Sequence, residues 1–266
     1  MLRFLISIAL IFSVAAFAQA QDWAKAKLEK SPRHGEWVKL KNDKREVQSF
    51  VVYPEIKEKA TAVIVIHEIF GLTDWVRLVC DQLAEAGYIA IAPDLLSGAG
   101  PKGGGSDSFG GGDAVRKAIL SLPADQITGD LNAATDYVAK LPACNGKVVV
   151  SGFCFGGSQT FRFATNNKTI KAAFVFYGTG PEADADIKRI EAPVYGFYGG
   201  NDARVNMTID KSKDLMKSAG KTYDPATYEG AGHGFMRMGE APDANEPNKK
   251  AKDEAWKRWK ELLKKV

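Results

Sequence analysis

The sequence is poor in the residues from which metal centres and disulfide frameworks are built. Its 266 residues include only 3 histidines and 3 cysteines, with no Cys-x-x-Cys and no histidine spacing typical of a zinc site. An odd number of cysteines leaves at least one thiol unpaired. The formal net charge of +4 is also small, which argues against a nucleic-acid partner. These shortages argue against a zinc site and against a nucleic-acid-binding protein, and they leave at least one unpaired thiol whose role must be explained.

Long hydrophobic runs are scarce too, and the one near the start has the pattern of a secretory signal peptide. Arg3 gives a positive start, residues 4–17 are apolar, and residues 18–20 (Ala-Gln-Ala) fit the small-x-small cleavage rule. A membrane span needs roughly 20 apolar residues, so an uncleaved anchor is the less favoured alternative. We expect cleavage after Ala20 and export to the periplasm or the medium, with no other membrane association.

Short apolar runs alternate with helical patterns along most of the remaining chain. Continuous apolar runs such as 62–66 are typical of strands buried on both faces of a sheet. The alternation predicts an α/β fold with a mostly parallel central sheet of about seven to eight strands, helices on both faces, and one domain over 21–266. We predict strands at 36–40 and 47–53 (an antiparallel hairpin), 62–66, 88–92, 147–151, 170–176, 194–198 and 222–228, and helices at 73–86, 125–141, 158–165 and 249–265.

One stretch, residues 98–112, is rich in glycine. Its start, Gly98 to Gly103, formally matches a dinucleotide-binding fingerprint, but it contains Pro101 and does not open a helix directly. We therefore interpret the stretch as a flexible loop near the strand ends, either a mobile lid or a surface connection.

Two of the three cysteines have structural interpretations. Cys80 lies on the apolar face of a predicted helix and is expected to be buried, and Cys144 lies in a predicted loop. A Cys80–Cys144 disulfide is compatible with the sequence, as are two free thiols, because the sequence does not establish the geometry that the bond requires.

The third cysteine lies in a nucleophile-elbow pattern. Gly152-Phe153-Cys154-Phe155-Gly156-Gly157 follows a predicted buried strand and precedes a predicted helix. In such an elbow, glycines two residues on either side of the nucleophile let the turn close, and the strained residue is exposed at the top of the sheet. A buried, inert cysteine in a Gly-rich turn is the alternative, and the residues around Cys154 in space decide between them.

Two further polar residues follow predicted strands in a suggestive order. Asp202 and His233 come after Cys154 in the order nucleophile, acid, histidine that α/β-hydrolases use. His233 can accept the thiol proton and return it to a leaving group, and Asp202 can fix the imidazole tautomer. Phe155 N–H, next to the nucleophile, is expected to be one of the two oxyanion donors. The second donor is expected from the loop after the 62–66 strand.

Several motifs taken together resemble the dienelactone hydrolase family over residues 45–264. They are His67-Glu68-Ile69-Phe70-Gly71, Ala92-Pro93-Asp94-Leu95, Gly152 to Gly157, Asp202 and His233-Gly234-Phe235-Met236-Arg237. The resemblance implies an α/β-hydrolase fold, a Cys154, Asp202 and His233 triad, Ile69 and Phe155 as the oxyanion donors, and no cofactor or metal. It also implies that Glu68 meets the resting thiol, keeps it neutral, and helps to deprotonate it when substrate binds. His67 is interpreted as support for the loop.

The resemblance is weaker for the residues that would bind substrate. Arg237 matches a family arginine that binds the substrate carboxylate. A second family arginine falls in the Gly-rich region, where Arg116 is a candidate although the local sequence departs from the family pattern. The leader is another departure, because well-known members act in the cytoplasm.

These features predict a hydrolase that cleaves a small ester or lactone through an acyl-cysteine intermediate. The substrate is expected to carry a carboxylate that pairs with Arg237. A broad-specificity carboxylesterase or thioesterase is one alternative. A non-catalytic ligand-binding or thiol-redox protein on the same fold is another, because fold alone does not define function. The sequence leaves the oligomeric state open.

Overall fold

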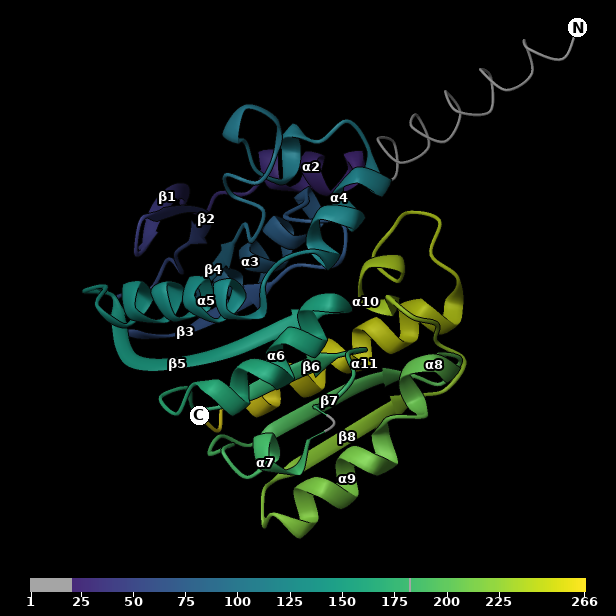
Figure 1. Cartoon of the computed structure of the whole chain (residues 1–266). Coiled ribbons are helices and arrows are strands. Elements are labelled where there is room, and N and C mark those ends of the chain that lie inside the picture. Colours follow the sequence, from purple (N-terminus) through teal and green to yellow (C-terminus); the bar gives the residue numbers. More distant parts are fainter. Residues whose placement is uncertain (1–20, 182) are drawn as a thin grey trace, which may run out of the picture.

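A sheet of eight strands runs through the residues that the computed structural model describes, 21–181 and 183–266 (Figure 1). Its strand order is β1-β2-β4-β3-β5-β6-β7-β8. Strand β1 pairs antiparallel with β2, and β2 pairs antiparallel with β4. Strands β3 to β8 are all parallel to one another. The strands are β1 (Gly35–Asn42), β2 (Arg45–Val52), β3 (Ala60–Ile66), β4 (Ile89–Pro93), β5 (Cys144–Phe153), β6 (Ala173–Phe176), β7 (Val194–Gly199) and β8 (Tyr223–Tyr228).

Helices cover both faces of the sheet, as the sequence predicted (Figure 1). One face packs against α2 (Asp22–Glu29), α3 (Asp74–Glu85) and α11 (Glu246–Leu263). The other packs against α5 (Ala124–Ala139), α6 (Phe155–Asn166), α7 (Asp184–Ile187) and α9 (Ile209–Ser218). The remaining short elements are η1 (Pro101–Gly103), η2 (Ser106–Ser108), α4 (Gly112–Leu120), α8 (Ala203–Asn206) and α10 (Phe235–Met238). The signal peptide expected over 1–20 lies outside the described residues.

The core is divided by the sheet into two apolar layers, because successive side chains of a strand point to opposite faces. Val63 and Val65 of β3 lie in the layer under α3 and α11, and Ile64 lies in the opposite layer under α5 and α6. This two-sided burial explains why the β3 sequence is continuously apolar. Trp259 of α11 is fully buried in the first layer, so the apolar face of the C-terminal helix belongs to the core.

The division of the core into two layers decides whether Cys80 and Cys144 can form a disulfide. Cys80 lies in the first layer on α3, whereas Cys144 lies in the second at the start of β5, and both are buried free thiols. The disulfide that the sequence allowed is therefore absent, because the sheet separates the two side chains.

Two expectations about local structure need correction. Strand β6 begins at Ala173 rather than 170, because Asn167 Oδ1 accepts hydrogen bonds from the N–H groups of Thr169 and Ile170 and holds that segment in a turn. The Gly-rich stretch is anchored rather than loosely held. Asp94 Oδ2 accepts a hydrogen bond of 2.7 Å from Ser106 N, and Asp94 Oδ1 accepts one of 2.6 Å from Ser106 Oγ.

Of the helices in 21–181 and 183–266, none combines the length and the apolar character that crossing a membrane requires.

Candidate active site

Cys154 lies in a strained turn between β5 and α6. Its φ is 57° and its ψ is −115°, a conformation that costs a non-glycine residue on the order of 1–3 kcal/mol. The turn closes tightly, because a Cβ on Gly156 would lie 2.2 Å from the carbonyl oxygen of Ile66. A Cβ on Gly152 would lie 2.2 Å from the carbonyl oxygen of Gly156. The sequence pattern therefore corresponds to an elbow in which both glycines are sterically required.

The thiol, the imidazole and a carboxylate form one hydrogen-bonded chain. His233 Nε2 lies 3.0 Å from Cys154 Sγ, and His233 Nδ1 lies 2.5 Å from Asp202 Oδ2. The three residues follow β5, β7 and β8, whose carboxyl ends meet at one edge of the parallel sheet. Asp202 is 6 % exposed, so its carboxylate is shielded from solvent beside the imidazole. The three residues predicted from the order of strand ends are thus brought together.

The two predicted oxyanion donors also converge on the thiol. The backbone N–H groups of Ile69 and Phe155 face Cys154, and each favours the thiolate by lowering the pKa of Cys154. Burial is the largest influence in the opposite direction, and the charge of Glu68 adds to it, so the pKa of the Cys154 thiol is raised to about 11. The resting thiol is therefore protonated at neutral pH.

Glu68 is held by Arg237 rather than by the thiol. Glu68 Oε2 accepts a hydrogen bond of 2.7 Å from Arg237 Nε, and the guanidinium lies 5.2 Å from the centroid of the Phe70 ring. The expected contact between Glu68 and the resting thiol is replaced by the contact of Cys154 with His233. Glu68 acts on the thiol through its charge, because a nearby anion disfavours a second one.

His67 connects the loop after β3 to the loop after β4. It is fully buried, Leu95 N donates to its Nε2 at 3.3 Å, and its Nδ1 lies 2.8 Å from Glu68 O. Because Nε2 accepts, Nδ1 carries the proton and donates to that carbonyl. Burial lowers the pKa of His67, which keeps the ring neutral. These bonds fix the backbone that presents Glu68 and Ile69.

A cavity of about 220 Å³ opens beside Cys154. Three of its lining residues were not found from the sequence: Leu120 at the end of α4, Tyr177 just after β6, and Arg204 on α8. The Tyr177 ring packs edge-on against His233 at a centroid distance of 5.2 Å. The positions of Tyr177 after a strand and of Arg204 two residues after Asp202 were available signals. The position of Leu120 had none.

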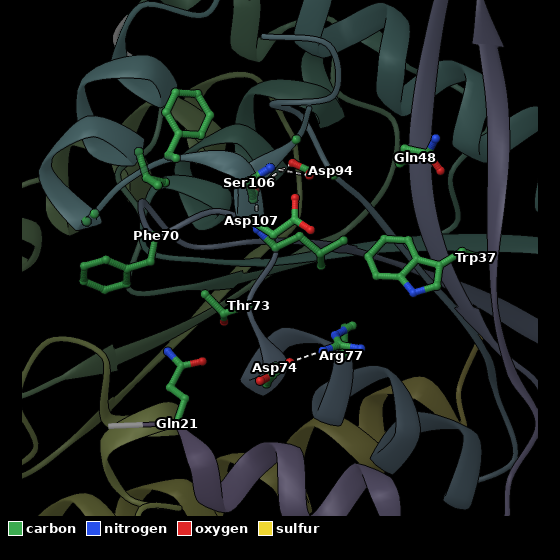
Figure 2. Close-up of a pocket in the computed structure, with 16 residues that line it drawn as sticks. Gln21, Trp37, Gln48, Phe70, Thr73, Asp74, Arg77, Asp94, Ser106 and Asp107 are labelled. Carbon is green, nitrogen blue, oxygen red and sulfur yellow. Dashed lines mark hydrogen bonds and ion pairs between the residues drawn. The ribbon is translucent and has the colours of Figure 1, made fainter. Parts of the chain in front are cut away.

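A larger cavity of about 570 Å³ lies between the Gly-rich stretch and α3, and neither Cys154 nor His233 lines it. Figure 2 shows Phe70 and Trp37 on opposite sides of this cavity, with the Asp74–Arg77 ion pair at one end and Asp94 bonded to Ser106 at the other. Phe70 also contacts Arg237, so this ring lies between the larger cavity and the Glu68–Arg237 pair.

Arg116, the second arginine expected to bind substrate, is not among the residues that line the cavity beside the thiol. It is exposed on α4, forms an ion pair of 3.5 Å with Asp113, and is among the lining residues of neither cavity. Its neighbours Val115 and Ile119 face inward and pack with Ile69 and Phe155, which turns Arg116 toward solvent. Across residues 21–181 and 183–266, no cluster of three or more His, Cys, Asp or Glu side chains could hold a metal ion.

A mostly parallel sheet flanked by helices, with a strained turn after a central strand and polar groups at the carboxyl ends of neighbouring strands, defines an α/β hydrolase. Comparison with known families narrows this class. Residues 47–266 match the family model described as the dienelactone hydrolase family, and the chain belongs to that family.

Curated relatives and solved structures agree with this assignment. A "Putative carboxymethylenebutenolidase" of Methylorubrum extorquens is 33% identical over 184 residues, which cover 65% of this chain and 62% of the relative. This chain therefore spans less than two thirds of that relative. One of the same name from Saccharolobus solfataricus is 28% identical over 85% of this chain and 96% of its own length.

The fold is also found in crystal structures of low sequence identity. A "Putative Dienelactone Hydrolase" from Klebsiella pneumoniae superposes with a TM-score of 0.76 at 23% identity, covering 88% of this chain and 99% of its own. A dienelactone hydrolase-like promiscuous phosphotriesterase from metagenomic libraries gives a TM-score of 0.73 at 21% identity, over 88% and 98% of the two chains. At this identity the likeness establishes the common fold.

Proposed function

We propose that this hydrolase cleaves a small ester or lactone through an acyl intermediate on Cys154. The observation that carries the proposal is the chain from Cys154 Sγ to His233 Nε2 to Asp202, with the thiol in the strained turn. A thiol attacks an acyl carbon as its thiolate, so the mechanism must first remove its proton.

His233 is the general base and then the general acid. Its Nε2 takes the thiol proton as sulfur bonds to the acyl carbon, and the negative charge moves to the carbonyl oxygen, where the N–H groups of Ile69 and Phe155 stabilise it. The C–O bond to the alcohol then breaks, and His233 donates the proton to the departing oxygen. Water attacks the thioester with His233 again as base, which releases the acid and restores the thiol. Asp202 holds the imidazole and stabilises its charged form.

Glu68 and Arg237 couple the anionic part of a substrate to the thiol. Glu68 raises the pKa of Cys154, and Arg237 holds Glu68 by an ion pair. A substrate carboxylate that competes for Arg237 frees Glu68 to assist deprotonation of the thiol. Before binding, the protonated thiol is protected from oxidation. The expected substrate is accordingly a small carboxylate-bearing ester or lactone.

The test is turnover of a panel of lactones and aryl esters by the wild type, Cys154→Ala and His233→Ala. We expect hydrolysis by the wild type and a loss of at least roughly 10³-fold in kcat for either variant, because the triad residues act as a unit. Circular dichroism confirms that each variant is folded. Hydrolysis that survives Cys154→Ala contradicts the mechanism, and a wild type without activity favours a ligand-binding or thiol-redox protein.

We also propose that residues 1–20 direct export and are removed. The supporting feature is the apolar run 4–17 followed by the Ala18-Gln19-Ala20 site. The mass of the protein recovered from the periplasm or medium should correspond to a chain that begins at Gln21. A cytoplasmic protein that retains Met1 contradicts this proposal.

A further inference from the structure

One charged side chain in the cavity beside Cys154 has no ion-pair or hydrogen-bond partner in the described part of the chain, although its charge favours the Cys154 thiolate. Arg204 lines this cavity, and its guanidinium makes no ion pair or hydrogen bond with any residue in 21–181 or 183–266. The two arginines singled out from the sequence are both occupied, Arg237 by Glu68 at 2.7 Å and Arg116 by Asp113 at 3.5 Å. Of the three, only Arg204 both lines the thiol cavity and is free to receive an anion.

The position of Arg204 is fixed relative to the reacting groups. It lies on α8, which starts directly after Asp202, and Asp202 Oδ1 caps this helix by accepting a hydrogen bond from Val205 N. The Asn206 side-chain amide donates at 2.8 Å to the carbonyl oxygen of Gly199, the last residue of β7. Because α8 is tied at both ends to the carboxyl end of β7, its backbone presents Arg204 at a set place beside the triad.

The rest of the cavity also favours a ligand rich in acceptors. Tyr177 is among the residues that line the cavity, and its buried hydroxyl has no hydrogen-bond partner in the described part of the chain. Burial raises the pKa of Tyr177 well above its usual range, so the hydroxyl stays protonated and can donate a hydrogen bond to a ligand. No Asp or Glu is found among the described residues that line this cavity. Because its hydrogen-bond donors face no carboxylate from the described lining residues, the cavity is suited to bind an anion.

We propose that Arg204 is a specificity-determining residue that binds a carboxylate of the substrate next to the acyl carbon attacked by Cys154. A planar guanidinium matches a carboxylate in a two-point contact. Arg237 must give up Glu68 before it can contact this carboxylate, whereas Arg204 gives up no partner among the described residues. Arg204 is therefore the first to hold the carboxylate, and Arg237 can join it only as Glu68 is released. That an anion binds at Arg204 is inferred from the cavity alone. That this anion belongs to a substrate rests on the proposed function.

The first experiment needs no turnover. Iodoacetate and iodoacetamide alkylate the same thiol and differ mainly in the negative charge of iodoacetate. We expect the ratio of their rates at Cys154, located by peptide mass spectrometry, to fall about tenfold in Arg204→Gln, because a charge-assisted contact is lost. Arg204→Lys should retain part of the ratio. Arg116→Gln removes the same charge from an exposed arginine that does not line the cavity and should leave the ratio unchanged.

The second experiment asks whether the anion site serves hydrolysis. We compare kcat/KM for para-nitrophenyl hemisuccinate and for para-nitrophenyl isocaproate, which has a neutral branched end of similar shape, above the rate measured with Cys154→Ala. Arg204→Gln should reduce kcat/KM for the anionic ester about tenfold, mainly through KM, and change the neutral ester little. A circular dichroism spectrum unchanged from the wild type excludes misfolding as the cause.

The outcomes separate this inference from the proposed function. An alkylation ratio that is unchanged in Arg204→Gln, or that falls equally in Arg116→Gln, overturns the assignment of Arg204. A ratio that falls only in Arg204→Gln while neither ester is hydrolysed supports the anion site and contradicts the proposed function. Esters that are hydrolysed with the same charge preference in the wild type and in Arg204→Gln overturn the role of Arg204 in specificity.

Discussion

The backbone that holds the thiol and the cavity wall that faces it are built in different ways. Around Cys154 the backbone is constrained, because Gly156 leaves no room for a Cβ and Cys154 itself holds a φ of 57°. The wall of the cavity includes side chains from other segments of the chain, among them Leu120, Tyr177 and Arg204. The first region depends on residue types at fixed spacing, and the second depends on tertiary packing. A family resemblance therefore reveals the chemistry of the site more clearly than its specificity.

Replacing a glycine of the constrained backbone should destabilise the protein far more than replacing one in the Gly-rich stretch, and this is the largest effect we expect. A methyl group at Gly156 would lie 2.2 Å from Ile66 O and 2.5 Å from His67 O, which are backbone atoms that cannot turn aside. We predict that Gly156→Ala lowers the free energy of unfolding by about 3 kcal/mol and Tm by roughly 10 °C. The measurement is thermal and urea unfolding.

The control for this prediction is Gly110→Ala in the Gly-rich stretch. A Cβ at Gly110 meets no atom within 4 Å, and Gly110 does not have a left-handed backbone conformation. Gly110→Ala should therefore change the free energy of unfolding by no more than about 0.5 kcal/mol. If both variants unfold alike, the constraint assigned to the elbow is wrong.

Glu68→Gln tests whether the charge of Glu68 controls the protonation of the Cys154 thiol. The charge of Glu68 raises the pKa of Cys154, whose value is about 11, so removing the charge should lower that pKa. Below its pKa a thiol reacts in proportion to its thiolate fraction, and we expect alkylation by neutral iodoacetamide at pH 8 to become about tenfold faster. Ester turnover should fall in the same variant, because Arg237 loses its partner and the thiol loses its assistant. An alkylation rate that is unchanged or slower contradicts the assigned electrostatic effect.

Leu120→Ala tests the wall of the cavity and should have the smallest effect. Leu120 is 67 % exposed, so its truncation should change the free energy of unfolding by no more than about 0.5 kcal/mol. Because its side chain lines the thiol cavity, we expect KM for esters with long acyl chains to rise about twofold to threefold while kcat stays constant. A large fall in kcat would contradict the assignment of Leu120 to the cavity wall alone.

The strands and the elbow could be predicted from sequence because their physical constraints act on neighbouring residues. Burial of β3 on both faces requires a continuous apolar run, and the turn at Cys154 requires glycines at two fixed positions. Strand order then placed Asp202 and His233 at one edge of the sheet. These inferences use spacing along the chain, which the sequence displays directly.

The remaining features depend on contacts between distant segments. Glu68 pairs with Arg237, 169 positions away in the chain, which no local pattern encodes. The Gly-rich stretch is anchored by Asp94, so its composition alone suggested more freedom than it has. Arg204 lies on a helix of four residues, too short to leave a periodic signal. The family resemblance pointed to the Gly-rich region, where Arg116 was the candidate, and gave no signal at Arg204.

The most direct test of the acyl-cysteine mechanism is the mass of the protein during turnover. The wild type is mixed with an activated ester, quenched in acid within milliseconds, and analysed by intact and peptide mass spectrometry. The mechanism predicts a transient gain equal to the acyl group, located on the peptide that contains Cys154 and absent in Cys154→Ala. Steady hydrolysis with no acyl group on Cys154, or with the acyl group on another residue such as Ser158, would contradict it.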